Sequence, residues 1–182
     1  MANHAPGSLG LVQDFVNTWE LDEPDGERIG TPEALGAWLR ERGLLSGERV
    51  DAADHALALE LREAIRGLLF VNNGRRAQAR DVALLNRVAS ESGLRPRFVA
   101  GGQVVLEPGA SGVRGAMGTL LGAVSAAMRE GTWARLKACA DDGCQWAFYD
   151  RSKNRSGHWC SMEVCGNRAK ARQFRQRRRA SH

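Results

Sequence analysis

The placement of the cysteines constrains this chain more than any other sequence feature. All four, Cys139, Cys144, Cys160 and Cys165, lie near the C-terminus as two pairs. Four residues separate the members of each pair, and 15 residues separate the pairs. Thiolates are preferred zinc ligands, and two close pairs joined by a hairpin or loop can supply the four corners of a tetrahedron. The spacing therefore predicts one structural zinc ion bound by these four side chains.

The spacing leaves some alternatives open. A regulatory disulfide within one pair, or a group of redox-active or simply buried thiols, would use the same residues. His158 is the only histidine near the pairs and could replace one cysteine as a ligand. A complete shell of four thiolates leaves no coordination position for water, so the predicted site is structural rather than catalytic.

The residues around the cysteines predict a small treble-clef-like finger. Residues 141–143, Asp-Asp-Gly, favour the turn that the first pair needs. Residues 145–149 alternate in hydrophobicity, which predicts a strand, and residues 151–157 form a polar loop. Ser161 is a suitable N-cap for a helix over residues 162–179 that would carry Cys165 in its first turn.

Positive charge is concentrated in the same segment. Residues 133–182 contain 12 Lys/Arg against 4 Asp/Glu, whereas residues 1–132 contain 14 against 17. The difference predicts two domains: a neutral-to-acidic body over 1–132 and a basic module over 133–182.

The basic module is expected to bind a polyanion. Arg168, Arg172, Arg175 and Arg179 are spaced by four, three and four residues, which places them on one helix face. The number of basic residues exceeds what is needed to compensate the negative C-terminal end of the helix dipole. Like charges this close together also repel one another. Val164, Ala171 and Phe174 form a separate stripe predicted to pack on the hairpin. The predicted nucleic-acid contacts are Arg151, Lys153, Arg155, Arg168, Lys170, Arg172, Arg175, Arg177, Arg178 and Arg179. An acidic protein, a membrane surface or a solvated helix end remain alternatives.

The first 132 residues are predicted to be mostly helical with one short hairpin, an α+β body. Apolar residues at spacings of three and four, together with capping residues, predict the helices. In the fourth expected helix, over residues 77–92, the core-facing side chains are expected to be Val82, Leu85 and Val88. The expected helices cover about 9–19, 31–43, 51–71, 77–92 and 111–130, with a Gly-Gly-linked hairpin over 97–106 and a loop over 21–30.

Small residues recur along the helix expected over 111–130. Gly112, Gly115, Gly118 and Gly122 predict close backbone packing, either within the monomer or across a homodimer. A phosphate-binding loop is disfavoured because no Lys-Ser/Thr pair follows these glycines. No Gly-x-Gly-x-x-Gly stands between a strand and a helix either.

Several function classes find no support in the sequence. No apolar stretch approaches the roughly 20 residues that span a bilayer, and the N-terminus does not resemble a signal peptide. A soluble cytoplasmic protein with no membrane partner is expected, and a reducing cytoplasm disfavours disulfides. No nucleophile–base pair or nucleotide-binding loop points to an enzyme. Asn17, Thr18, Glu20 and His55 are the candidate polar residues of a pocket in the N-terminal domain, although core or surface roles are the favoured interpretation of them.

Two stretches resemble known families. Cys165-Gly166-Asn167-Arg168 is the signature of the CGNR zinc finger, and residues 146–154 and 159–162 are also similar to that family. Residues 14–18 and 31–39 resemble the ABATE domain that usually precedes this finger. Together the two resemblances cover nearly the whole chain.

The resemblance implies a bacterial stress-related transcription regulator, and it favours DNA over RNA as the partner. In such a regulator the N-terminal domain is expected either to sense a small-molecule or protein effector or to mediate dimerisation. The alternative is a zinc-stabilised protein-interaction or RNA-binding module without sequence-specific DNA recognition.

Overall fold

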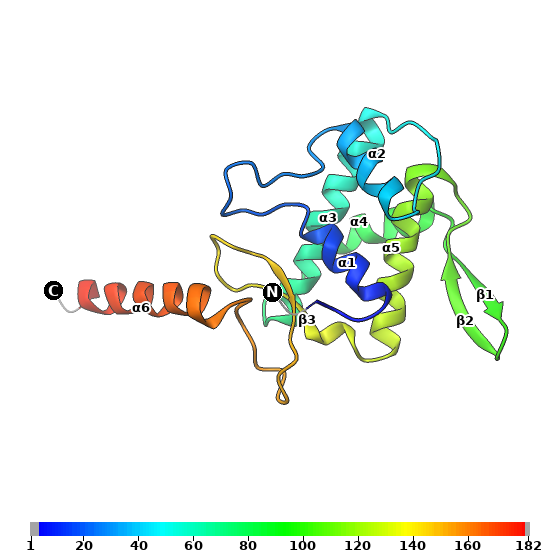
Figure 1. Cartoon of the computed structure of the whole chain (residues 1–182). Coiled ribbons are helices and arrows are strands. Elements are labelled where there is room, and N and C mark those ends of the chain that lie inside the picture. Colours follow the sequence, from blue (N-terminus) through cyan, green and yellow to red (C-terminus); the bar gives the residue numbers. More distant parts are fainter. Residues whose placement is uncertain (1–3, 181–182) are drawn as a thin grey trace.

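The computed structural model describes residues 4–180, in which helices form the body and a small finger follows (Figure 1). The helices are α1 (Ser8–Val16), α2 (Pro32–Glu41), α3 (Ala52–Asn72), α4 (Ala79–Glu91), α5 (Gly112–Arg129) and α6 (Asn167–Ala180). The strands are β1 (Arg95–Val99), β2 (Gln103–Glu107), β3 (Leu136–Ala138) and β4 (Ala147–Tyr149), with a 3₁₀ turn at Trp133–Arg135 and a π-helical turn at Met162–Gly166. Both sheets are two-stranded and antiparallel. None of the helices described is long and apolar enough to cross a membrane.

Helix α3 forms the centre of the body. Asp51 caps its start by accepting a hydrogen bond from the Asp54 amide at 2.7 Å. Leu57, Leu61, Ile65 and Leu69 follow at intervals of four and are all buried. Full burial of each such side chain contributes roughly 1.5–3 kcal/mol, which explains why this apolar stripe fixes α3 among α1, α4 and α5. The predicted helix over 51–71 is confirmed.

Helix α2 begins as its capping residues predict. Thr31 accepts a hydrogen bond from the Ala34 amide at 3.2 Å, and Pro32 occupies the first helical position of α2. Phe15 of α1 packs on Trp38 of α2, with ring centroids 5.6 Å apart. Helix α1 ends at Val16, earlier than expected, so Trp19 lies in the following loop.

Helix α4 lies at the edge of the body and buries little of its surface. Val88 is its one fully buried residue, and Leu85 is half-buried. Val82 is 41% exposed, so the prediction that it faces the core is wrong. The apolar spacing identified the helix correctly, but a helix at the edge has neighbours on only part of its circumference.

The β1–β2 hairpin projects from the body (Figure 1). Val99 pairs with Gln103, so the connecting loop contains Ala100, Gly101 and Gly102, one residue more than predicted. Gly101 and Gly102 have φ angles of 93° and 76°, in the left-handed region that glycine tolerates.

The glycine face of α5 packs within the chain. A Cβ atom at Gly115 would lie 2.4 Å from the Ala110 carbonyl oxygen, and one at Gly122 would lie 2.8 Å from that of Leu106. A Cβ atom at Gly118 would clash with Ser92 and Pro108. The expected close backbone packing is therefore present between α5 and the segments at the two ends of the hairpin, and a homodimer stays a prediction.

The C-terminal segment shares the apolar core of the body. Trp133, Leu136, Ala138, Ala147 and Tyr149 are buried in the same cluster as the core residues of α1, α3 and α5. The division into domains at residue 132 stays a prediction, and the core is continuous across that position. The fold class is confirmed: a mostly helical α+β body with a short hairpin, followed by a four-cysteine finger.

Candidate metal centre and basic helix

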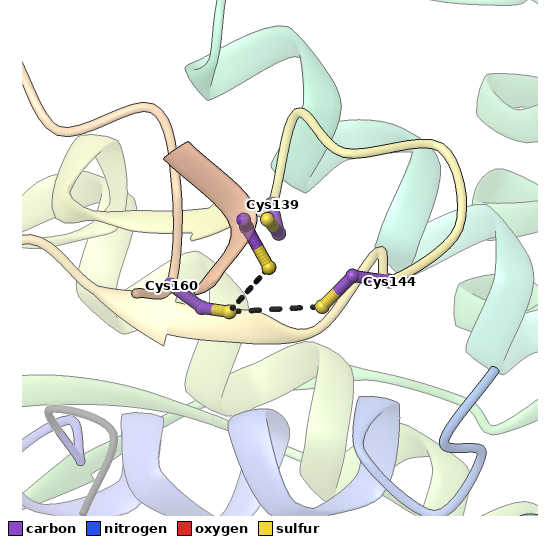
Figure 2. A group of neighbouring side chains, drawn as sticks. Cys139, Cys144 and Cys160 are labelled. Carbon is purple, nitrogen blue, oxygen red and sulfur yellow. Dashed lines mark hydrogen bonds between the residues drawn. The ribbon is translucent and has the colours of Figure 1, made fainter. Parts of the chain in front are cut away.

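The side chains of the four cysteines lie close together, and Figure 2 labels Cys139, Cys144 and Cys160 of this cluster. Their sulfur atoms all lie within 4.8 Å of one another. The Cys144 and Cys160 sulfurs are 3.6 Å apart, and those of Cys160 and Cys165 are 3.7 Å apart. All four are free thiols, and Cys139, Cys144 and Cys165 are buried.

These distances fit a tetrahedral zinc site. Zinc–sulfur bonds of about 2.3 Å place the sulfurs of an ideal tetrahedron about 3.8 Å apart, close to the separations observed. A disulfide would require sulfurs about 2.0 Å apart, so the arrangement does not contain one. Trp146 and Trp159 pack against the cluster and shield it. The donor set and its spacing suit one structural zinc ion.

Local sequence explains how each pair is positioned. Strand β3 leads into Cys139, and a turn follows in which the Cys144 amide donates to the Asp141 carbonyl at 2.9 Å. Strand β4 then leads away from Cys144. In the second pair, the Ser161 hydroxyl accepts a hydrogen bond from Val164, and both Cys165 and Gly166 donate to the Ser161 carbonyl. Cys165 thus lies in the first turn of a helix, as predicted for a treble-clef-like finger.

The thiols perturb one another strongly. Hydrogen bonds from Cys144 and Cys160 lower the pKa of Cys139 to about 2. The hydrogen bond to Cys139 in turn raises the pKa of Cys144 to about 12, and the pKa of Cys160 is also raised for the same reason. Zinc binds thiolates, so its binding must release the protons that the other thiols hold, and the affinity must depend on pH.

His158 lies outside the sulfur cluster. Its Nδ1 atom is 2.6 Å from Oδ1 of Asn73, at the end of α3. Its carbonyl oxygen accepts hydrogen bonds from Asn73 and from the Ala140 amide. His158 therefore helps to attach the finger to α3 rather than completing the metal site.

A set of polar side chains from the body holds the finger by its main chain. Asn17 hydrogen bonds to both the amide and the carbonyl of Ala147, at 2.8 and 2.9 Å. Further side chains from α1, α3 and the C-cap of α3 also donate to main-chain carbonyls of the finger. These are Gln13 to Ala147, Arg66 to Gln145, Asn72 to Trp133 and Leu136, and Asn73 to Ala138 and His158.

The four polar residues considered for a pocket all have structural partners. Asn17 and Thr18 line a cavity of about 860 Å³ between α1, α2 and Trp146. Thr18 donates to the Phe15 carbonyl at 2.8 Å. Glu20 pairs with Arg28, and the His55 ring bonds to the Ile29 carbonyl at 2.8 Å. Asn17 therefore joins the body to the finger, whereas Thr18, Glu20 and His55 bind partners within the body.

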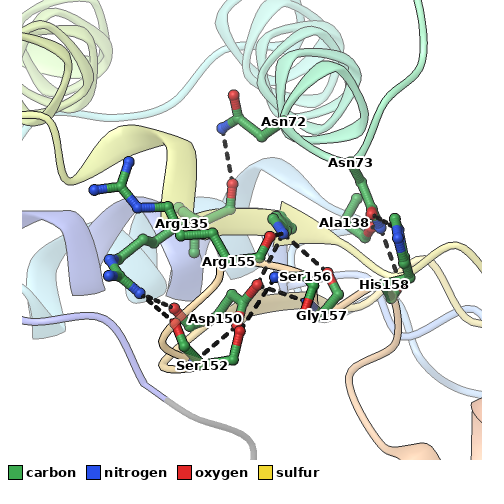
Figure 3. Close-up of polar contacts among 12 residues, drawn as sticks. Asn72, Asn73, Arg135, Ala138, Asp150, Ser152, Arg155, Ser156, Gly157 and His158 are labelled. Carbon is green, nitrogen blue, oxygen red and sulfur yellow. Dashed lines mark hydrogen bonds and ion pairs between the residues drawn. The ribbon is translucent and has the colours of Figure 1, made fainter.

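A buried ion pair fixes the loop over residues 151–157 (Figure 3). Lys137 Nζ lies 2.8 Å from Asp150 Oδ2, and both side chains are almost completely buried. Asp150 also accepts hydrogen bonds from the amides of Ser152 and Gly157, at 2.9 and 2.8 Å. Burial raises the pKa of Asp150, but the hydrogen bonds from Lys137 and Ser152 outweigh it and hold that pKa well below its usual range. Sequence reasoning missed this pair.

The same loop carries three of the predicted nucleic-acid contacts. Lys153 and Arg155 are exposed, and Arg155 adopts a left-handed φ of 52°. Arg151 is also exposed, but its guanidinium donates to the His4 carbonyl at 2.9 Å. Lys137 and Asp150 thus give these three basic residues a fixed scaffold.

Two arginines of the predicted ridge are held by acidic residues. Arg172 Nη2 lies 2.8 Å from Asp141 Oδ1, and Arg168 Nε lies 3.1 Å from Asp141 Oδ2. The second contact is an ion pair without hydrogen-bond geometry. Arg168 Nη2 also reaches Asp22 Oδ2 at 3.1 Å and the Cys165 sulfur at 3.4 Å. Asp141 is buried, so this cluster attaches the start of α6 beside the cysteines.

Beyond this cluster, α6 projects away from the rest of the protein (Figure 1). The remaining predicted contacts on the helix, Lys170, Arg175, Arg177, Arg178 and Arg179, are all exposed. Val164 and Phe174 are 53% and 63% exposed, and Ala171 is exposed as well. The prediction that this stripe packs on the hairpin is therefore wrong, because α6 points outward instead of folding back.

Comparison with protein families agrees with this architecture. Residues 135–178 match the model of the CGNR zinc finger. Residues 9–143 match the ABATE model, described as "Putative stress-induced transcription regulator". No curated protein gives a significant match. The ABATE match covers well over half of the chain and the finger match contains all four cysteines, so the chain belongs to the ABATE family and ends in a CGNR zinc finger.

Proposed function

We propose that this protein is a zinc-dependent DNA-binding transcription regulator. In this proposal Cys139, Cys144, Cys160 and Cys165 bind one structural zinc ion. Helix α6 and the loop over 151–157 contact the phosphate backbone of DNA. The observation that carries the proposal is the outward-pointing α6, whose exposed face is dominated by arginine and lysine.

The charge and length of α6 support a polyanionic partner. The 14 residues of α6 include seven Lys/Arg and no Asp/Glu. An isolated helix of this length is marginal in water, and its like charges repel at spacings of three and four. Phosphates would relieve this repulsion, and the major groove of B-DNA is wide enough for one α-helix.

Zinc is proposed to align the basic surface with the body. Cys165 lies two residues before the start of α6, and Cys139 follows directly on β3, so an ion bound to both joins the helix to the shared core. The thiols must stay reduced to bind zinc, which fits a reducing compartment such as the cytoplasm.

The N-terminal body is proposed to sense a small-molecule or protein effector or to mediate dimerisation. The cavity of about 860 Å³ supports the first role, because it is lined both by α2 and by Trp146, two residues after Cys144. A ligand there would touch the body and the finger together.

Binding of the zinc-loaded protein to a labelled mixed-sequence duplex at several salt concentrations tests the proposal. Six to eight phosphate contacts predict that log affinity falls with log salt at a slope of about −5 to −7. Replacing Arg175 with alanine should weaken binding to all duplexes and make the slope less steep by about one. Arg49→Ala, which removes an exposed arginine from the body, is the matched control and should change neither quantity.

Two results would reject the proposal. One is the absence of binding to any duplex by zinc-loaded protein. The other is preferential binding of single-stranded RNA, or of a protein that competes for the basic face, either of which would favour the alternative interaction module.

A further inference from the structure

The loop between α1 and α2 is strongly acidic and reaches the finger. Residues 19–27 contain five acidic residues and no basic one: Glu20, Asp22, Glu23, Asp25 and Glu27. Two of them are paired within the body, Glu20 with Arg28 and Glu27 with Arg62. Asp22 instead pairs with Arg168 of α6, 146 residues away in the sequence. The loop therefore presents a carboxylate to the basic helix.

This loop has a defined conformation. Its two ends are joined by hydrogen bonds from the Arg28 amide to the Thr18 carbonyl at 2.8 Å and from Glu20 to Gly26 at 3.0 Å. A Cβ atom at Gly26 would lie only 1.9 Å from the Glu20 carbonyl oxygen, so only glycine allows this closure. Glu27 accepts two hydrogen bonds, at 2.7 and 2.6 Å, from the guanidinium of Arg62, which is buried on α3. The acidic loop is thus preorganised beside the finger.

Asp22 and Asp141 hold Arg168 in different ways. Asp141 is 1% exposed and binds both Arg168 and Arg172, so it belongs to the interior of the finger. The Asp22 side chain is 37% exposed, and within the described part of the chain Arg168 is its one ion-pair partner. A phosphate group can replace Asp22 by a side-chain movement, whereas replacing Asp141 would open the packed finger.

We infer that the acidic loop over residues 19–27 competes with nucleic acid for α6, and that Asp22 occupies the position on Arg168 that a phosphate would take. The inference rests on the proposed function. The competition makes the free protein bind DNA more weakly than the same protein would without the carboxylate of Asp22. An effector that moved the loop would relieve the competition.

The expected effect is modest and depends on salt. An exposed ion pair changes an affinity by roughly two- to five-fold at most, and salt screens it. Glu23 and Asp25 are also exposed on the loop, and they make no ion pair among residues 4–180. They repel an approaching phosphate backbone only at longer range.

Charge-neutralising variants of the full-length, zinc-loaded protein separate these effects. Asp22→Asn should bind a labelled mixed-sequence duplex about two- to five-fold more tightly than wild type at low salt. The gain should shrink as salt rises. Asp25→Asn removes the same charge from the same loop and should give a smaller gain. In an Arg168→Ala background, Asp22→Asn should gain no more than Asp25→Asn does, because the competing arginine is absent and only the longer-range charge effect is left. Zinc content and thermal unfolding confirm that each variant is folded.

Equal gains from Asp22→Asn and Asp25→Asn would overturn the inference in favour of a general charge effect. So would an unchanged or weaker affinity of Asp22→Asn while wild type binds DNA, and that result would leave the proposed function intact. Failure of wild type and Asp22→Asn alike to bind any duplex would instead reject the proposed function together with this inference. Binding by Asp22→Asn alone would support both.

Discussion

The side chain of Asn17 in the body bonds to both main-chain groups of Ala147 in the finger, in the way that a residue of a neighbouring β-strand would. Its Oδ1 atom accepts from the Ala147 amide, and its Nδ2 atom donates to the Ala147 carbonyl. Asn17 is 7% exposed, so water cannot easily replace either bond. The N-terminal stretch around Asn17, which resembles the ABATE domain, therefore serves to attach the finger.

Replacing Asn17 with alanine should lower the free energy of unfolding by about 1–3 kcal/mol, because the buried Ala147 amide loses its partner. The Ala147 carbonyl would keep its bond from Gln13. Denaturant unfolding followed by circular dichroism measures the change. Asn86→Ala, an exposed asparagine on α4, is the control and should stay within about 0.5 kcal/mol of wild type. Equal losses in the two variants would contradict the assigned role.

Replacing Asp150 with asparagine should cost about 3–5 kcal/mol of stability at neutral pH, because Lys137 would stay buried without its partner charge. Asp142→Asn, at a side chain that is 85% exposed, controls for the loss of a carboxylate. A difference of less than about 1 kcal/mol between the two variants would show that the buried pair does not stabilise the finger.

The contribution of Asp150 should also depend on pH. Its folded-state pKa is lowered, so its stabilisation is present above the unfolded-state value of about 3.9. It is lost as pH falls from there through the folded-state pKa. The stability gap between wild type and Asp150→Asn should therefore be constant near neutrality and narrow below about pH 4. Denaturant unfolding at a series of pH values, with zinc content followed in parallel, measures this gap. A gap that widened on acidification would contradict the sign of the shift.

Removing zinc with a chelator should affect the finger more than the body. The apolar residues of α3 and α5 are buried independently of the cysteines, so their amides should stay protected from hydrogen exchange. The amides around the cysteines and those of α6 should exchange much faster, because only a small cluster of side chains surrounds the cysteines. The amides of β4 should stay protected, because Ala147 and Tyr149 belong to the core of the body. Mass spectrometry of deuterated peptides makes this comparison. Loss of protection throughout the chain would show instead that zinc stabilises the whole fold.

The metal site and most helices were predictable because they depend on local patterns. Two cysteine pairs and the turn residues between them define a zinc site without reference to the rest of the chain. The periodic leucines of α3 and the Thr31-Pro32 start of α2 likewise carry their own signals. The spacing of Gly115, Gly118 and Gly122 predicted close packing, although it could not identify the segments that fill the space.

The features that sequence reasoning missed depend on contacts between distant segments. Strand β3 is only three residues long and contains Lys137, whose buried ammonium group is bound by Asp150 and by the carbonyls of Arg155 and Gly157. The spacing of the arginines in α6 does not reveal that Asp141 and Asp22 bind two of them. Phe174 was expected to be buried because it is apolar, yet the direction of α6 leaves it exposed.

Elemental analysis of protein purified under reducing conditions tests the central claim most directly, with Cys165→Ser measured beside wild type. The account predicts one zinc ion per wild-type chain, no retained zinc in the variant, and loss of the ordered finger with the metal. Structural zinc binding supplies about 10 kcal/mol or more of apparent free energy in small fingers. Wild-type protein without zinc, or a Cys165→Ser variant that kept both its metal and its folded finger, would contradict the account.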